Sequence, residues 1–196
     1  MENASKPSLP VIALTAADVP RLVDHYMQLS PGDLRLRFFG GSPTVQERRR
    51  EWLTDLVKGM FKRATTQQLG IVDPTDGEAL VGVASWGPCN EQPEIVDFGV
   101  SVVPAWRGQG LTLALMDQAC SSAVQAGHTT MRVEYMPDND AVKSLLRKTG
   151  QVLPMSWRLG GANASLKPYA DDVQHQLELL ATFLEALDLG NQPAKL

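Results

Sequence analysis

The sequence predicts a mixed α+β domain in which helices flank a twisted central sheet, mostly antiparallel but with one β-α-β crossover. Three observations indicate this class. A helix-start signature at residues 15–18 predicts a helix that runs to residue 29, and residues 45–64 repeat apolar side chains at helical spacing. From residue 69 the pattern becomes that of strands, and the turn at residues 74–77 predicts a β-hairpin of residues 69–73 and 79–86. The strand–helix–strand order over residues 95–135 then predicts the crossover.

Local signals delimit the elements in order. Thr15-Ala16-Ala17-Asp18 predicts a helix start with a hydroxyl cap and an early acid, and Ser30-Pro31-Gly32 predicts the end of that helix. A strand is expected over residues 95–103, a helix over 111–126 that ends at Gly127, and a strand over 131–135. A helix over residues 140–148 and a last strand over 152–159 complete the sheet.

The length of 196 residues suits one domain with a small appendage. We therefore expect a domain over residues 1–160, followed by a linker and a C-terminal amphipathic helix over residues 161–196. Gly160-Gly161-Ala162-Asn163 forms the expected linker. The apolar stripe of the helix comprises Val173, Leu177, Leu180, Leu184 and Leu187. It packs either on the domain or on a second subunit, so a homodimer is a possible assembly.

Composition excludes several classes of function. The net charge is −4, which argues against a nucleic-acid partner because phosphates require a basic stripe. No apolar run approaches the roughly 18 residues of a membrane span, and the N-terminal ten residues lack a signal-peptide core. We therefore expect a cytoplasmic protein without a membrane partner. The two cysteines and three histidines stand at no metal-ligand spacing, so no metal is expected.

Residues 100–112 carry the strongest chemical signal. A strand ends at Pro104, and Gly108 and Gly110 permit conformations in which successive amides converge before a helix begins. A helix N-terminus attracts a pyrophosphate, with Arg107 as an additional cation. The plainer interpretation is a glycine turn that binds nothing.

Two other phosphate folds fit less well. A P-loop requires Lys-Ser/Thr after the last glycine, and none follows. A dinucleotide fold gains support from Gly108, Gly110 and Glu134, a plausible ribose-binding acid. It fails at Leu113, which stands where the third glycine belongs, and the remaining chain is too short for its further β-α units. A nucleotide-cofactor oxidoreductase is therefore a distant alternative.

The same segment resembles the signature of the GNAT superfamily of N-acetyltransferases, a strand followed by Arg/Gln-x-x-Gly-x-Gly/Ala and a helix. The matching positions are Arg107, Gly110 and Thr112, of which Thr112 departs from the small residue of the family. Residues 139–150 resemble the second motif of the family, an Asn, an amphipathic helix and a glycine. The resemblance covers about residues 11–159 and implies acetyl-CoA as cosubstrate and an amine as acceptor.

A further likeness lies in Leu29-Ser30-Pro31, Leu36-Arg37-Phe38-Phe39 and Asp97-Phe98-Gly99-Val100. These segments resemble the branch that acetylates lysines on bacterial proteins, notably acyl-CoA synthetases. That branch is often fused to a synthetase-like or cyclic-nucleotide-binding region, and this sequence contains neither. The acceptor therefore stays open between a protein lysine and a small amine.

The resemblance also implies which residues hold the cofactor. Val100 and Val102 would hold the thioester and the pantetheine arm by their backbone groups, as an added strand is held. Asn139 would contact the arm, although it also stands where a cap for the helix at Asp140 belongs. The expected cofactor-binding set is Val100, Val102, Arg107, Gly108, Gln109, Gly110, Leu111, Thr112 and Asn139.

Acetyl transfer to an amine requires a proton acceptor, because a lysine with a pKa near 10.4 is protonated at pH 7. Asp97 is the best candidate, since it alternates with the apolar Phe98 and Val100 and shares a strand face with Gly99 and Ser101. The resemblance places an acid there as well. Alternatively, Asp97 only pairs with a neighbouring strand or faces water. Glu94 and Glu134 are weaker candidates.

One departure concerns the leaving group. Many family members have a tyrosine at Leu146 that protonates the thiolate, and leucine cannot do so. Water would serve, because a thiol of pKa near 8.5 is a tolerable leaving group; Tyr135 is a conceivable substitute. Gln151 replaces the usual Phe after the glycine and mainly affects packing. The missing tyrosine makes a non-catalytic acyl-CoA-binding regulatory module the principal alternative to an enzyme.

Overall fold

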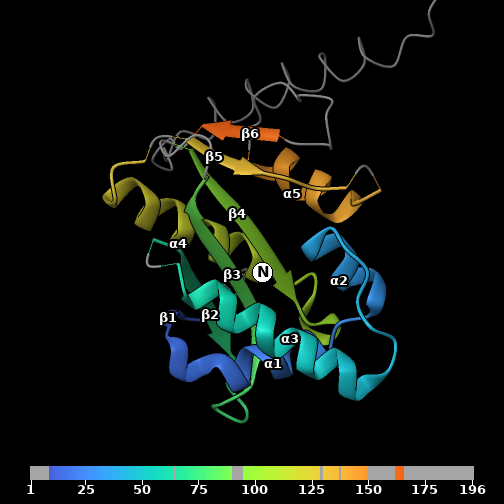
Figure 1. The fold of residues 1–196 in the computed structure, drawn as a ribbon. Coiled ribbons are helices and arrows are strands. Elements are labelled where there is room, and N and C mark those ends of the chain that lie inside the picture. The colour runs from blue at the N-terminus through green and yellow to red at the C-terminus, as the bar shows by residue number, and fades with distance from the viewer. Residues whose placement is uncertain are drawn as a thin grey trace, which may run out of the picture.

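The computed structural model describes residues 9–63, 65–89, 95–128, 130–136, 138–149 and 162–165. Figure 1 shows one sheet with helices on both faces. The strands are β1 (Val11–Leu14), β2 (Gln67–Val72), β3 (Leu80–Pro88), β4 (Ile95–Val102), β5 (Thr130–Val133) and β6 (Ala162–Ser165). The helices are α1 (Val19–Met27), α2 (Pro31–Phe38), α3 (Gln46–Phe61), α4 (Leu111–Gln125) and α5 (Asp140–Thr149), and 3₁₀ turns cover Ala16–Asp18 and Pro104–Trp106.

The strands follow one another across the sheet in the order β1-β2-β3-β4-β5-β6. Neighbours are antiparallel except β4 and β5, which are parallel and joined through α4. This arrangement confirms the predicted fold class and its crossover. Strand β6 lies where a linker was expected, because Ala162 and Asn163 pair with Val133 and Arg132 of β5. The strand expected over residues 152–159 and the helix expected beyond residue 165 lie outside the described residues.

Capping residues fix the N-terminal helices. Thr15 and Asp18 form a capping box that starts the turn leading into α1, as the sequence predicts. Helix α1 ends at Met27, two residues before the expected end, and Ser30 then caps a separate helix, α2. In this second capping box the partner of Ser30 is Asp33, whose backbone N–H donates to Ser30 Oγ at 3.0 Å.

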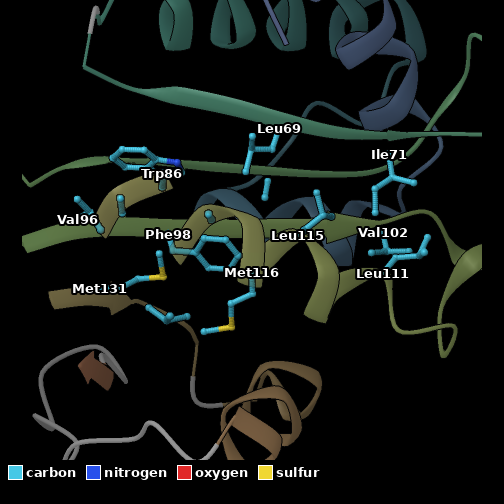
Figure 2. Close-up of a cluster of buried hydrophobic side chains, with 14 of the residues drawn as sticks. Leu69, Ile71, Trp86, Val96, Phe98, Val102, Leu111, Leu115, Met116 and Met131 are labelled. Carbon is cyan, nitrogen blue, oxygen red and sulfur yellow. The ribbon is translucent and has the colours of Figure 1, made fainter. Parts of the chain in front are cut away.

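Two apolar clusters pack against opposite faces of the sheet. Figure 2 shows the first, in which Leu111, Leu115 and Met116 of α4 contact side chains of β2 to β5. The second joins α1, α2 and α3 to the other face through residues such as Leu22, Leu53 and Val83. The sheet is therefore rigidly held on both sides. None of the helices within the described residues is both long and apolar enough to cross a bilayer.

A buried histidine links the second cluster to the sheet. His25 of α1 is fully buried, and its Nδ1 lies 2.8 Å from the Leu80 carbonyl oxygen. Because a carbonyl only accepts, Nδ1 carries the proton, and Nε2 accepts from the Ser101 hydroxyl at 2.9 Å. Burial lowers the pKa of His25 to about 4, with a smaller contribution from the charge of Arg37, against the opposing effect of the Leu80 carbonyl.

This histidine makes stability depend on pH. The neutral form is the one that fits, so the unfolded chain binds a proton more readily between the unfolded pKa of 6.5 and the folded pKa of about 4. As pH falls through that window, we expect His25 to lower the free energy of unfolding by at most about 3 kcal/mol. Urea titrations at pH 7 and pH 4.5 of the native protein and His25→Asn measure this.

The variant is expected to be less stable at pH 7, and the difference from the native protein should shrink at pH 4.5. His128→Gln is the matched control, because His128 is only half-buried and contacts Trp86 by its ring. A difference between native protein and His25→Asn that is independent of pH would contradict the assigned protonation state.

Candidate functional site

The parallel ladder between β4 and β5 ends early. Its last pair is Asp97 with Arg132, whereas β4 continues to pair with β3 as far as Val102. Helix α5, α2 and the diverging β5 border the gap that opens beside β4 (Figure 1). Within the described residues, this edge of β4 therefore has no neighbouring strand along residues 98–102.

The hydrogen-bond pattern fixes which backbone groups face this gap. Val103 N–H donates to Val81, and Cys89 N–H donates to Ile95, which makes the pairs of Val102 and Val96 with β3 the non-hydrogen-bonded kind. By alternation, residues 98, 100 and 102 direct their N–H and C=O groups away from β3. An extended chain can therefore add to β4 at Val100 and Val102.

A cavity of about 570 Å³ opens at the same place. Its walls are β4, the turn before α4, α5 and α2. The predicted site residues that line it are Asp97, Val100, Val102, Arg107, Gly108, Gly110, Thr112 and Asn139. Residues from three separate segments of the chain are thus brought together around one cavity.

The glycine turn has the backbone geometry that an anion site requires. Gly108 and Gly110 adopt φ of 75° and 86°, in the left-handed region. The first intrahelical donor of α4 is Leu113, which bonds to the Gly110 carbonyl. The N–H groups of Leu111 and Thr112 precede it, so they belong to the set that a helix leaves for external partners.

Two of the predicted cofactor-binding residues direct their side chains away from the cavity. Leu111 packs in the apolar cluster under the sheet, so only its backbone N–H faces the site. Gln109 directs its side chain to the Ala105 carbonyl at 3.5 Å and is not among the residues that line the cavity.

Arg107 is held by two partners on the rim of the cavity. Its Nε donates to the Val102 carbonyl at 3.1 Å, and its Nη2 lies 2.8 Å from Asp33 Oδ1. Burial alone would raise the pKa of Asp33, but hydrogen bonds from Ser30 and the charge of Arg107 outweigh it, and the pKa is lowered. Asp33 is therefore an ionised competitor for the cation that a pyrophosphate would use.

Asn139 has the capping role that the sequence left open. Its Oδ1 accepts from the Val142 N–H at 3.2 Å, and its side chain is nearly buried. It also lines the cavity, beside Val142 and Ser144 of α5. Capping and a contact to a ligand are compatible at this position.

Asp97 lies where β4 and β5 separate, and its carboxylate is paired. Arg132 of β5 donates from Nε to Oδ1 at 2.6 Å and from Nη2 to Oδ2 at 3.0 Å. Glu134 lies farther away, at 3.4 Å from Arg132 Nε. The hydrogen bond that Arg132 donates to Asp97 is the main reason that the pKa of Arg132 is raised above its ordinary value. The sequence did not reveal Arg132, although it stands two residues before Glu134 on the same strand face.

The other candidates for proton transfer differ in whether they line the cavity. Glu134 lines the cavity and is partly exposed. Tyr135 is buried in the cluster beneath the sheet and is not among the residues that line the cavity, so its hydroxyl is poorly placed for a departing thiolate. Glu94, Gln151 and the side chain of Leu146 lie outside the described residues.

Helix α2 contributes residues whose place in the site the sequence did not indicate. Arg37 and Phe39 line the cavity opposite α5, and Arg37 Nη2 donates to Ser85 Oγ at 2.7 Å. His25 accepts a hydrogen bond from Ser101, which also lines the cavity. Its low pKa makes it a weak base, so the Ser101–His25 pair does not suit nucleophilic catalysis. The described part of the chain contains no group of three or more potential metal ligands.

This geometry agrees with the comparisons to known proteins. The acetyltransferase (GNAT) family matches residues 34–150, more than half of the chain, and the chain belongs to that family. It is a GNAT acetyltransferase, an enzyme that uses acetyl-CoA and acts on an amine acceptor. No curated protein matches the chain significantly.

Solved structures show the same fold at low identity. The GNAT domain of PAT from S. lividans is 18% identical with a TM-score of 0.66, over 79% of this chain and 88% of that one. PaiA N-acetyltransferase from Thermoplasma acidophilum, solved with coenzyme A, is 13% identical with a TM-score of 0.61, over 81% and 99%. Ribosomal-protein-S5-alanine acetyltransferase from Vibrio fischeri is 14% identical with a TM-score of 0.56, over 79% and 90%.

The contact between Asp33 and Arg107 yields a pair of opposite predictions. Arg107→Gln removes the rim cation and is expected to raise the Kd for acetyl-CoA roughly tenfold, because charge-assisted contacts to phosphate are strong. Asp33→Asn keeps the capping geometry but releases Arg107, and is expected to lower that Kd. Isothermal titration calorimetry measures both. Arg50→Gln is the matched control, since Arg50 pairs with Asp24 on the exposed surface. Equal Kd values for all three variants would contradict a phosphate role for Arg107.

Proposed function

We propose that this enzyme transfers the acetyl group of acetyl-CoA directly to a primary amine, with Asp97 as the general base. The observation that carries the proposal is the position of Asp97. It lines the cavity at the point where β4 leaves β5, on the same strand as the unpaired Val100 backbone. A base and a backbone edge for the thioester thus adjoin one another.

Different parts of the cavity serve different parts of the cosubstrate. The N–H groups of Leu111 and Thr112, with Arg107, suit the pyrophosphate. The edge of β4 suits the pantetheine arm, which carries amide groups that can pair as a strand does. The Val100 N–H, directed into the gap, would donate to the carbonyl oxygen on which negative charge develops.

The chemistry then needs only a neutral amine. The amine nitrogen attacks the carbonyl carbon of the thioester, its proton passes to Asp97 directly or through water, and the C–S bond breaks as the carbonyl re-forms. The departing thiolate takes a proton from water, which its pKa near 8.5 allows without a tyrosine at Leu146. Asp97 returns its proton to solvent, so the enzyme ends the cycle unchanged.

Arg132 acts on Asp97 as a positioning residue. The bidentate contact fixes the plane of the carboxylate. Each carboxylate oxygen keeps a second lone pair, so Asp97 can still accept from an ammonium or from water.

Asp97→Asn preserves the shape of the side chain but cannot accept the proton. We expect kcat to fall by about 10²-fold or more, while the Kd for acetyl-CoA changes less than about twofold. The release of CoA thiol with an amine acceptor measures turnover, and calorimetry measures Kd. Asp117→Asn, an exposed change on α4, is the matched control.

Glu134→Gln tests which of the two carboxylates that contact Arg132 acts as the base. Turnover within a few-fold of the native value is expected for this variant. Loss of turnover in Glu134→Gln with retention in Asp97→Asn would move the base to Glu134. Binding of acetyl-CoA by the native protein without transfer to any amine would instead favour the non-catalytic acyl-CoA-binding module.

A further inference from the structure

Arg37 lines the cavity beside the middle of β4. Its guanidinium packs directly on Gly99 of β4, so closely that a Cβ at Gly99 would come within 2.4 Å of Arg37 Nη1. Nη2 is fixed by Ser85, the β3 partner of Gly99. Only a glycine at position 99 leaves room for this guanidinium against the strand.

Arg37 lacks the carboxylate partner that five other arginines have. Ion pairs join Arg21 to Asp18, Arg35 to Asp138, Arg50 to Asp24, Arg107 to Asp33 and Arg132 to Asp97. Within the described residues no acid pairs with Arg37, and its Nε is buried without a hydrogen-bond partner. A partly buried cation that lines a cavity and has no carboxylate partner favours an anionic ligand.

The place of Arg37 assigns that anion to the acceptor. The gap that suits the pantetheine arm lies in the plane of the sheet, at the edge of β4. Arg37 instead lies above the strand, on the face that Asp97, Gly99 and Ser101 share. The phosphate turn follows the C-terminal end of β4. A group that contacts Arg37 therefore approaches from the α2 face of the strand, away from the pantetheine arm and the phosphates.

The spacing of charges on this face suits a small molecule. Gly99 and Asp97 are two residues apart on one strand, about 7 Å. In an α-amino acid the nitrogen and the carboxylate carbon are about 2.5 Å apart. With a hydrogen bond of about 3 Å at each end, such a molecule spans a distance of this order. A lysine side chain in a protein carries no anion at that distance from its amine.

Phe39 adds an apolar contact to the same pocket. It follows α2 with φ of 58°, a left-handed conformation that is rare for an aromatic residue, and its side chain is 48% exposed. Phe39 lines the cavity together with Leu36 and Leu29. This conformation ends α2, because the Phe39 N–H donates to the Arg35 carbonyl as the C-cap of the helix. An exposed ring at the cavity suits an apolar part of the ligand.

We infer that the acceptor is an α-amino acid with an apolar side chain, whose carboxylate binds Arg37 while its amine faces Asp97 and its side chain contacts Phe39. This inference rests on the proposed function and narrows its acceptor. Acetylation forms the N-acetyl amino acid and releases CoA. The Leu36-Arg37-Phe38-Phe39 segment thereby gains a role in substrate selection.

Matched acceptors test the inference. Leucine, leucinamide and 3-methylbutylamine share the apolar side chain, and only leucine carries the anion. We expect kcat/KM for leucine to exceed that of the other two by about 10- to 100-fold. A lysine-containing peptide with neutral neighbours is the fourth acceptor and should be poor.

Arg37→Met should abolish the preference for leucine by raising the KM for leucine. Leucinamide turnover and the Kd for acetyl-CoA should stay within about twofold of the native values. Arg37→Lys should restore part of the preference, and Arg50→Met should change nothing. Thermal unfolding of each variant checks the fold. Equal use of leucine and leucinamide, a preference for the lysine peptide, or an equal loss with all acceptors in Arg37→Met would overturn the inference.

Binding gives a second readout that does not need turnover. Calorimetry of leucine and leucinamide against the CoA-bound protein should show tighter binding of leucine, lost in Arg37→Met. If no acceptor is acetylated but this difference appears, the proposed function fails and the anion site stands. If leucine does not bind and other amines are acetylated, the anion site fails and the proposed function stands.

Discussion

The separation of β5 from β4 after the Asp97–Arg132 pair creates the site on which the rest of the account depends. It leaves Val100 and Val102 with backbone groups that face a gap, and it opens the cavity at the end of the ladder. The same ion pair closes the ladder and holds the carboxylate that would accept a proton. Apolar clusters pack on both faces of the sheet beside this edge.

Helix α2 forms the third wall through polar contacts. Asp33 reaches the phosphate turn, Arg35 reaches Asp138 before α5, and Arg37 reaches Ser85 on β3. Only Leu34 of this helix is fully buried, and Phe38 packs edge-on against Tyr26. One short helix therefore contacts every other wall of the cavity, which links the cosubstrate end of the site to the acceptor end.

Local chemistry made much of the site predictable. Two glycines between a strand and a helix dictate the turn, and strand alternation places Asp97 with Gly99 and Ser101. Arg132 and Arg37 depend on contacts between segments distant in sequence, which periodicity does not report. Strand β6 was missed because Gly160 and Gly161 resemble a linker, whereas pairing with β5 decides its conformation.

The central claim is that acetyl-CoA lies along the unpaired edge of β4, with its pyrophosphate at the N-terminus of α4. Titration of ¹⁵N-labelled protein with acetyl-CoA, followed through backbone amide chemical shifts, tests it most directly. The account predicts that the largest changes occur at Val100, Val102, Gly110, Leu111 and Thr112, and that NAD(P) does not produce them. Saturable acetyl-CoA binding that leaves these five amides unmoved would contradict it.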